Sequence, residues 1–400
     1  VFTINKFIPI NSLFVLLTLP GLSAQELASL EHDTGSGKYN SLCQVDSDTY
    51  ALAYTGGGND GFITTFTISA DGTSITEVAS LEHDTDKGKY NSLCQVDSDT
   101  YALAYASTND DGFITTFTIS ADGSTITEVA SLEHDTGRPE DGMYNSLVQV
   151  DSDTYALAYA GDDEDGFITT FTIPADGSSI TEVQTLEHDT FHGGANSLVQ
   201  VDADTYALAY AGRLGDGFIS TFTISADGSS ITEVASIEHD DNVGEYNSLV
   251  QVDSDTYALA YKGPNDDGFI KTFTIPSDGS TITEVATLEH DTQYGKHNSL
   301  IQVDADTYAL AYAGDGNDGY ITTFTIPANG SSITEVASFE YDTDFGQYNS
   351  LVKVDSDTYV LSLTGKDDDG FIKTFTIQSD GSMGSTAISG NAGFRMLSSP

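Results

Sequence analysis

Positive charge is the scarcest property of this 400-residue chain. It has 13 Lys and Arg residues against 62 Asp and Glu residues, which gives a formal net charge of −49 at pH 7. A protein this acidic repels phosphate backbones and anionic lipid surfaces, so we expect no nucleic-acid partner. Hydrophobic residues still make up 38% of the chain, more than is typical of a disordered acidic chain. The composition therefore indicates a folded, acidic protein.

Tryptophan is absent and cysteine is limited to Cys43 and Cys94. The two cysteines occupy the same place in two copies of an internal repeat, where the other copies have Val or Ile. A position that accepts Val or Ile is an apolar packing site, so we interpret both thiols as buried rather than disulfide-bonded.

Long apolar runs are confined to the first residues. A single cation, Lys6, precedes an apolar run from Leu13 to Leu19, a Pro-Gly pair and a small-residue pair that ends at Ala24. This order predicts a secretory signal peptide over residues 1–24, and the run is too short to span a bilayer. We expect a secreted, periplasmic or cell-surface protein without membrane insertion. Residue 1 is Val rather than Met, so the chain can also be a fragment.

An internal repeat dominates the remaining sequence. The tripeptide Asn-Ser-Leu begins at Asn40, and it returns at intervals of 51 residues with one interval of 54. Each copy has four segments, of which "TYALAYAG" and "GFITTFTI" alternate large and small side chains with a period of two. Such alternation predicts strands, and the Asp-, Ser- and Gly-rich segments between them predict turns. Four strands in each of seven repeats predict an all-β, seven-bladed β-propeller with antiparallel blades.

The two ends of the repeat predict how the ring closes. The last copy lacks its fourth strand, whereas "QELASLEHD" at residues 25–33 matches the fourth strand "TEVASLEHD" at residues 76–84. We expect the N-terminal strand to complete the last blade, which removes an exposed sheet edge. The domains are then a signal peptide at 1–24, a propeller at 25–381 and a C-terminal tail at 382–400.

The pattern "DTYALAYAG…DGFITTFTI…ADGSSITEVASLEHD" resembles the seven-bladed propellers of secreted or periplasmic bacterial proteins, including lactonase-like ones. The resemblance covers residues 25–381 and concerns architecture and hairpin rhythm. No catalytic motif of the lactonase-like family and no Trp-Asp dipeptide of WD40 repeats is present.

The copies differ mainly in two connections, and the rare cations gather there. The connection after the fourth strand and the connection between the second and third strands vary, whereas "DSDT" and "ADGSS" turns are nearly constant. In an up-and-down blade the two variable connections emerge on one face, so we expect that face to recognise a partner. Long loops that simply tolerate polar residues are the alternative. The predicted binding residues are Lys38, Lys87, Arg138, His192, Arg213, Lys262 and Lys296.

Two repeated acidic motifs invite a metal interpretation. "EHD" recurs around the ring, but its copies lie in separate blades, whereas a zinc site needs three or four ligands around one point. We therefore expect each His to make a structural hydrogen bond within its blade. The Asp before each "GF" fits a turn better than a calcium loop, because the first Asp and the closing Glu of such a loop are missing. No cofactor is expected, and weak calcium binding stays open.

The sequence favours a secreted or cell-surface binding or scaffold module, a monomer that recognises an extracellular protein or glycan. Catalysis needs a constellation that occurs once, and no Ser-His-Asp pattern, phosphate loop or Cys-His pair stands out. A propeller hydrolase with a metal in its central channel, and an envelope assembly factor, are the alternatives.

Overall fold

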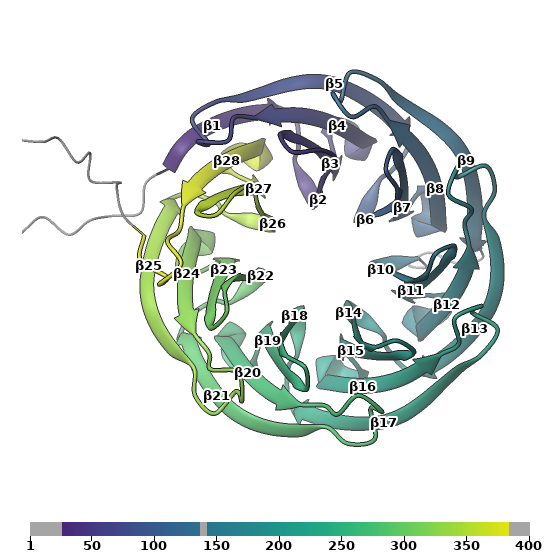
Figure 1. Cartoon of the computed structure of the whole chain (residues 1–400), viewed down its shortest axis with the longest axis vertical. Helices are drawn as coiled ribbons and strands as arrows, with labels where there is room; N and C mark the ends of the chain where they lie inside the picture. Colours follow the sequence, from purple (N-terminus) through teal and green to yellow (C-terminus); the bar gives the residue numbers. More distant parts are fainter. Residues whose placement is uncertain (1–25, 137–141, 384–400) are drawn as a thin grey trace, which may run out of the picture.

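The computed structural model describes residues 26–136 and 142–383, which form a closed ring of seven four-stranded sheets (Figure 1). The predicted signal peptide, Arg138 and the tail from residue 384 lie outside the described residues. In six sheets the strand order follows the sequence, as in β2-β3-β4-β5, the seventh has the order β1-β28-β27-β26, and all pairs are antiparallel. The seven-bladed β-propeller is therefore confirmed. We number the blades in chain order, so that blade 1 holds β2 to β5 and blade 7 holds β26, β27, β28 and β1.

The strands occupy four concentric positions. The innermost strands are β2 (Lys38–Gln44), β6 (Lys89–Asp97), β10 (Met143–Asp151), β14 (Gly194–Asp202), β18 (Glu245–Asp253), β22 (Lys296–Asp304) and β26 (Gln347–Lys353). The second strands are β3 (Thr49–Thr55), β7 (Thr100–Ala106), β11 (Thr154–Ala160), β15 (Thr205–Ala211), β19 (Thr256–Lys262), β23 (Thr307–Ala313) and β27 (Thr358–Thr364). The third strands are β4 (Gly61–Ile68), β8 (Gly112–Ile119), β12 (Gly166–Thr172), β16 (Gly217–Ile224), β20 (Gly268–Thr274), β24 (Gly319–Thr325) and β28 (Gly370–Thr376). The outer strands are β1 (Glu26–Asp33), β5 (Ile75–Asp84), β9 (Ile126–Asp135), β13 (Thr181–Asp189), β17 (Ile231–Asp240), β21 (Thr283–Asp291) and β25 (Thr334–Asp342).

The hydrophobic core lies between neighbouring blades. Ala51 and Ala53 of blade 1 pack in one cluster with Tyr101, Leu103 and Phe117 of blade 2. The small residues of one blade thus receive the large residues of the next, and the second strands are buried along almost their whole length. This is the arrangement that the alternation of large and small side chains predicts for stacked sheets.

The ring closes where the sequence predicts. Strand β1 pairs with β28, with Leu30 opposite Ile372 and Ser29 opposite Lys373. Figure 1 shows the purple N-terminal strand lying along the yellow end of the chain. Closure covers the outer edge of β28, so blade 7 has the same four strands as the others.

A short 3₁₀ turn, not predicted from the sequence, follows the second strand of every blade. These turns are η1 (Gly57–Asn59), η2 (Thr108–Asp110), η3 (Asp162–Glu164), η4 (Arg213–Gly215), η5 (Pro264–Asp266), η6 (Asp315–Asn317) and η7 (Lys366–Asp368). The middle residue of each has a positive φ, a conformation that Gly, Asn and Asp adopt most readily.

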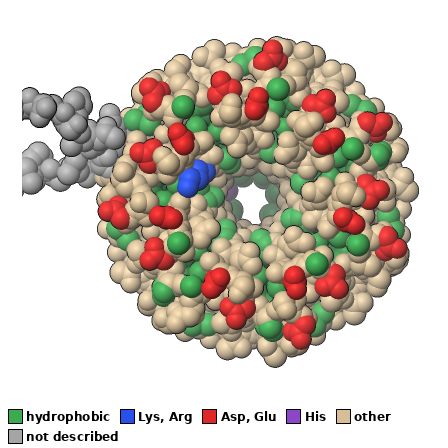
Figure 2. Space-filling view, viewed as in Figure 1, with side chains coloured by type: hydrophobic (Ala, Val, Ile, Leu, Met, Phe, Trp, Pro, Cys, Tyr) green, Lys and Arg blue, Asp and Glu red, His purple; other side chains and the backbone are tan. Residues whose placement is uncertain are grey.

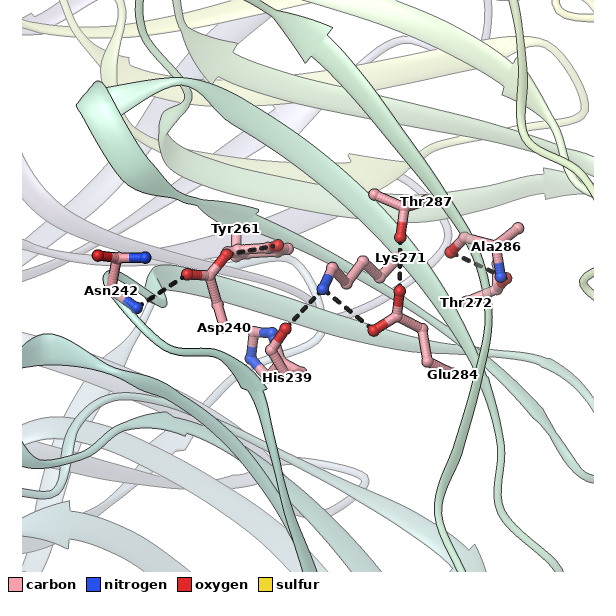
Figure 3. A network of polar contacts seen from close by, with 9 residues as sticks. All are labelled: His239, Asp240, Asn242, Tyr261, Lys271, Thr272, Glu284, Ala286 and Thr287. Carbon is pink, nitrogen blue, oxygen red and sulfur yellow. Dashed lines mark hydrogen bonds and ion pairs between the residues drawn. The ribbon is translucent and has the colours of Figure 1, made fainter.

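Two lysines are buried between blades rather than exposed on a face. The ammonium group of Lys271, on β20, donates to the carbonyl oxygen of His239 in the preceding blade and pairs with Glu284 at 3.1 Å (Figure 3). Lys373 makes the equivalent bridge from β28 to the carbonyl of Tyr341 at 3.0 Å. Both replace a Thr or Ser of the other blades, so each joins two blades through a charge-assisted hydrogen bond.

Both cysteines are free and half-buried in inner strands β2 and β6. Each packs against the core cluster at its blade junction, as the Val and Ile of the other copies predict. Burial raises the pKa of the Cys43 thiol to about 11.

Candidate functional site: the variable face and the channel mouth

The two variable connections lie on the same face and contact each other. The amide of Gly88, in the loop after β5, donates to the carbonyl of Asn59 in η1 at 3.0 Å. The same contact recurs around the ring, for example from Gly193 to Glu164 and from Gly295 to Asp266. We call the surface formed by these two sets of loops the variable face.

The opposite face carries the uniform turns. Figure 2 shows one face of the disc, with acidic side chains all around the ring, basic colour at one place only and an open central channel. The cations of the variable loops come from several blades, so this view shows the face of the uniform turns. The two faces therefore differ in charge pattern as well as in sequence variation.

Most of the predicted cationic binding residues are paired with carboxylates of a neighbouring turn. Lys38 lies 2.9 Å from Asp368, and Lys87 lies 3.2 Å from Asp110. Lys296 reaches Asp266 at 3.3 Å. These pairs are partly exposed and contribute about 0–1 kcal/mol each. They show that the lysines neutralise acidic turns, and their role in binding stays a prediction.

Lys262 is the most enclosed of these predicted cations. Its ammonium group lies 2.7 Å from Glu245 and 3.0 Å from Asp266, and the two carboxylates hold the pKa of Lys262 above its usual value despite burial. It also lies over the ring of Tyr246 at 5.8 Å. Its charge is thus already satisfied within the protein.

Of the two remaining described candidates, His192 lies in the loop that leads from β13 into blade 4, and Arg213 of blade 4 contacts Phe191 of the same loop. The Arg213 guanidinium stacks on the ring of Phe191 at 4.8 Å, and His192 Nδ1 lies 3.2 Å from the carboxylate of Glu164. Phe191 remains 60% exposed beside this pair. The structure therefore brings His192 and Arg213 to one side of the variable face, next to an exposed aromatic ring.

Leu214 adds a second exposed apolar side chain to this part of blade 4. It is the middle residue of η4, it has φ 65° and it is 86% exposed. Each of the other blades has a residue there that tolerates the left-handed conformation. Those residues are Gly58, Asn109, Asp163, Asn265, Gly316 and Asp367.

A collar of aromatic rings, which the sequence pattern did not predict, surrounds the channel mouth. Its members are the residues that precede the repeated Asn of each inner strand. They are Tyr39, Tyr90, Tyr144, Ala195, Tyr246, His297 and Tyr348. All have φ between 50° and 56°, and the amide of each following Asn donates to the collar carbonyl of the preceding blade, as Asn91 does to Tyr39 at 3.1 Å. The visible signal was the alternation of Tyr, His and Ala at one otherwise constant position.

Neighbouring rings of the collar contact one another except in blade 4. Ring centroids lie 4.5 Å apart for Tyr39 and Tyr90 and 4.6 Å apart for Tyr90 and Tyr144. His297 continues the collar at 4.3 Å from Tyr348. Ala195 has no ring, so the collar is open between Tyr144 and Tyr246.

The collar encloses a cavity of about 330 Å³ that reaches into this opening. Its lining includes His192, Gly194, Ala195 and Glu245 in addition to the collar and its asparagines. A Cβ atom on Gly194 would lie 2.7 Å from His192 Nε2, so the absence of a side chain at residue 194 makes room for this imidazole. Burial lowers the pKa of His297 to about 3, so its ring is neutral at physiological pH.

The prediction that each "EHD" histidine makes a hydrogen bond within its blade is wrong. The His83 ring lies at the junction between blades 1 and 2, 4.7 Å from the Tyr105 ring in an edge-to-face contact. Neither of its ring nitrogens has a direct protein hydrogen-bond partner. The Asp of the motif has a local role instead, as at Asp33, whose Oδ1 accepts the amide of Gly35 at 2.7 Å, and at Asp84, whose Oδ1 accepts the amide of Asp86 at 2.9 Å.

The Asp residues before "GF" close the turns through their backbone, as Asp60 does by accepting the amide of Gly56 at 2.9 Å. Within the described part of the chain, no group of three or more His, Cys, Asp and Glu is arranged to hold a metal ion. Weak calcium binding at the Asp-rich turns stays a prediction. No helix in residues 26–136 or 142–383 is long and apolar enough to cross a membrane.

Neither a protein-family model nor a curated protein matches this chain. Solved structures match it at low identity. The periplasmic gluconolactonase of Pseudomonas aeruginosa is 14% identical, with a TM-score of 0.57, over 73% of this chain and 82% of that one. A putative 6-phosphogluconolactonase of Bacteroides fragilis is also 14% identical, with a TM-score of 0.58, over 75% and 83%. Sqt1 of Saccharomyces cerevisiae is 10% identical, with a TM-score of 0.56, over 89% and 100%. These likenesses show the fold alone, a β-propeller whose architecture it shares with lactonase-like proteins.

Proposed function

We propose that this chain is a secreted or cell-surface binding module that recognises an extracellular partner through its variable face, with blade 4 at the centre of the contact. The partner is a protein or a glycan. The predicted signal peptide supports the location, and the concentration of sequence differences on one face supports the binding role.

Leu214 is the observation that carries the proposal. A non-glycine residue in the left-handed conformation costs about 1–2 kcal/mol, and an exposed leucine gains no burial in return. The other six blades have Gly, Asn or Asp at the middle position of the same turn. A residue that breaks a local rule without a gain in the folded chain is expected at a functional site.

The neighbours of Leu214 have the composition of a protein-binding centre. Phe191 and Arg213 stack on each other, and aromatic and Arg side chains dominate binding energy at protein interfaces. His192 and the opening at Ala195 lie on the channel side of the same blade. An apolar side chain of a partner protein could contact Leu214 and Phe191, so a protein is favoured over a glycan.

The test begins with the protein without residues 1–24, screened against panels of extracellular proteins and glycans. Once a partner is found, its affinity is measured for Phe191→Ser, Arg213→Ser and Leu214→Asn. Truncation of a contact centre costs about 2 kcal/mol or more, so at least one variant should bind at least about 30-fold more weakly. A partner whose affinity is unchanged in all three variants contradicts the assignment of blade 4.

A second set of variants tests the face rather than the blade. We expect binding to weaken when Lys38, Lys87, Arg138, Arg213, Lys262 and Lys296 are changed together to Ser. An equal number of changes in the "DSDT" turns provides the matched control on the opposite face. If only the "DSDT" set loses binding, the partner binds the face of the uniform turns, which contradicts the proposal.

The second candidate function is a propeller hydrolase with a metal in its channel, which the shared architecture with a gluconolactonase favours. The described channel mouth presents Tyr, Asn and His297. Lactone hydrolysis that needs an added divalent cation, and that is lost in His297→Ala, would support the hydrolase instead of the binding module.

A further inference from the structure

Six blade junctions contain the same pair of buried polar groups without direct protein partners. Each pair consists of an outer-strand imidazole and the side-chain oxygen of the Asn that begins the next blade. The pairs are His32 with Asn40, His83 with Asn91, His134 with Asn145, His188 with Asn196, His239 with Asn247 and His290 with Asn298. In every pair both ring nitrogens and the Asn Oδ1 atom are buried, and none of these atoms has a hydrogen-bond partner among the described residues.

The junction between blades 6 and 7 is built differently. Tyr341 occupies the place of the imidazole, and its hydroxyl donates to Asn349 Oδ1 at 2.7 Å. The same hydroxyl lies 3.5 Å from the carbonyl oxygen of Gly346. Asn349 Oδ1 is therefore the one repeated Asn oxygen in the described chain that has a partner.

Glycine contacts show how far each side chain reaches. A Cβ atom on Gly346 would lie 2.9 Å from the Tyr341 hydroxyl oxygen. At the equivalent Gly88, the three nearest atoms to such a Cβ all belong to Gly61, and the third of them is 3.6 Å away. The His83 ring thus stops short of the place where the Tyr341 oxygen lies.

We propose that each of the six His–Asn junctions binds one water molecule, and that the Tyr341 hydroxyl takes the place of this water at the seventh junction. The water accepts the imidazole N–H and donates to Asn Oδ1. Its second hydrogen faces the carbonyl of the glycine that corresponds to Gly346, which is Gly295 at the His290 junction, where this oxygen accepts the Asn298 amide at 3.0 Å. Three partners of this kind are typical of buried water in proteins.

A neutral water molecule fits this site because the groups that surround it are uncharged. Its groups are an imidazole, a side-chain amide oxygen and a peptide carbonyl, and no carboxylate takes part. The neighbouring Asp84 uses Oδ1 to accept the amides of Asp86 and Lys87. A calcium ion needs six to eight oxygen ligands, which this junction does not offer.

The direct test is a crystal structure of the protein at a resolution that shows ordered water. We expect a density peak within hydrogen-bond distance of both Asn Oδ1 and an imidazole nitrogen at the six His junctions, and none at Tyr341. Junctions without such a peak, or an Asn side chain that bonds directly to the imidazole, would overturn the proposal. A peak with a metal-like coordination shell would overturn it too.

Two substitutions move the water count in opposite directions. Tyr341→His should add a seventh site, and His83→Tyr should remove one while its hydroxyl bonds to Asn91. Tyr341→Phe is the matched control, because it keeps the ring and removes only the hydroxyl. It should lower the melting temperature, because Asn349 Oδ1 loses its donor.

Magnetic relaxation dispersion of water in solution counts long-lived buried waters and does not depend on crystals. Its amplitude should rise by about one-sixth of the His–Asn contribution in Tyr341→His and fall by the same amount in His83→Tyr. If His83→Tyr does not fold, Tyr341→His and the wild-type amplitude still decide the question. An amplitude that is the same in wild type and Tyr341→His contradicts the proposal.

Discussion

At the residue scale, the histidines of the repeat combine deep burial with a neutral state. Burial lowers the pKa of His83 to about 4 and that of His290 to about 3, both from 6.5. Nearby acids oppose this shift only weakly, as Asp84 does at His83. The imidazoles therefore act as neutral packing groups, and their protonation destabilises the folded state.

As the pH is lowered, this protein should unfold at a higher pH than protonation of its carboxylates alone would cause. The folded-state pKa of each imidazole is lowered, so its contribution is fully present above about pH 6.5 and is lost as pH falls toward 4. Each fully shifted imidazole changes the unfolding free energy by about 1.4 kcal/mol per pH unit. Chemical denaturation between pH 7 and 4.5 measures this slope, and His290→Tyr should reduce it by one imidazole's share. A slope that does not change in His290→Tyr contradicts the assignment.

The sequence predicted what depends on local pattern and missed what depends on contacts between blades. The large and small faces of "TYALAYAG" follow from alternation alone, and the core confirms them. The partner of His83 could not be predicted, because its ring lies against Tyr105 of the next blade. The collar could not be predicted for a related reason, since its rings contact one another across blade boundaries, as Tyr39 and Tyr90 do.

At the element scale, β1 completes the seventh blade and closes the ring. It pairs with β28 and packs Leu30 against the closing cluster that joins blades 7 and 1. The repeat count at the two ends of the chain predicted this pairing. The 3₁₀ turns were not predicted, because loops of different composition, such as "GGN" and "RLG", adopt one shape.

Deletion of residues 25–33 should open the ring. Strand β28, with the apolar sequence "GFIKTFT", would then expose its edge, and exposed apolar edges promote aggregation. Lys373 would also lose its ion pair with Glu26. Size-exclusion chromatography and thermal melting measure the outcome. A monomeric deletion variant with an unchanged melting temperature would contradict the closure.

At the scale of the whole molecule, acidic repulsion is distributed around the disc. The pKa of Asp165 is raised mainly by burial and in addition by the charge of Glu187. The pKa of Asp318 is raised in the same way, by burial and by the charge of Glu340. Such shifts indicate carboxylates that repel their neighbours. The lysines of the variable face offset part of this repulsion through pairs such as Lys38 with Asp368.

Salt should therefore stabilise the fold. Screening at physiological ionic strength acts over about 8 Å, so it reaches carboxylates in adjacent turns. The melting temperature should rise between very low and moderate NaCl, and a flat response would show that self-repulsion is unimportant. A further rise with Ca²⁺ that Mg²⁺ does not reproduce would indicate binding at the Asp-rich turns.

The most direct test of the account exchanges the loops of blade 4 and leaves its core intact. Residues 190–195, "TFHGGA", are replaced by "TQYGKH" from residues 292–297, and residues 213–215, "RLG", by "DGN" from residues 315–317. The exchange fills the collar at residue 195 and removes Phe191 and Leu214. Affinity for the partner found by screening and the melting temperature are measured together. We predict a folded protein with the wild-type melting temperature or higher that no longer binds the partner, whereas binding at wild-type affinity would contradict recognition through blade 4.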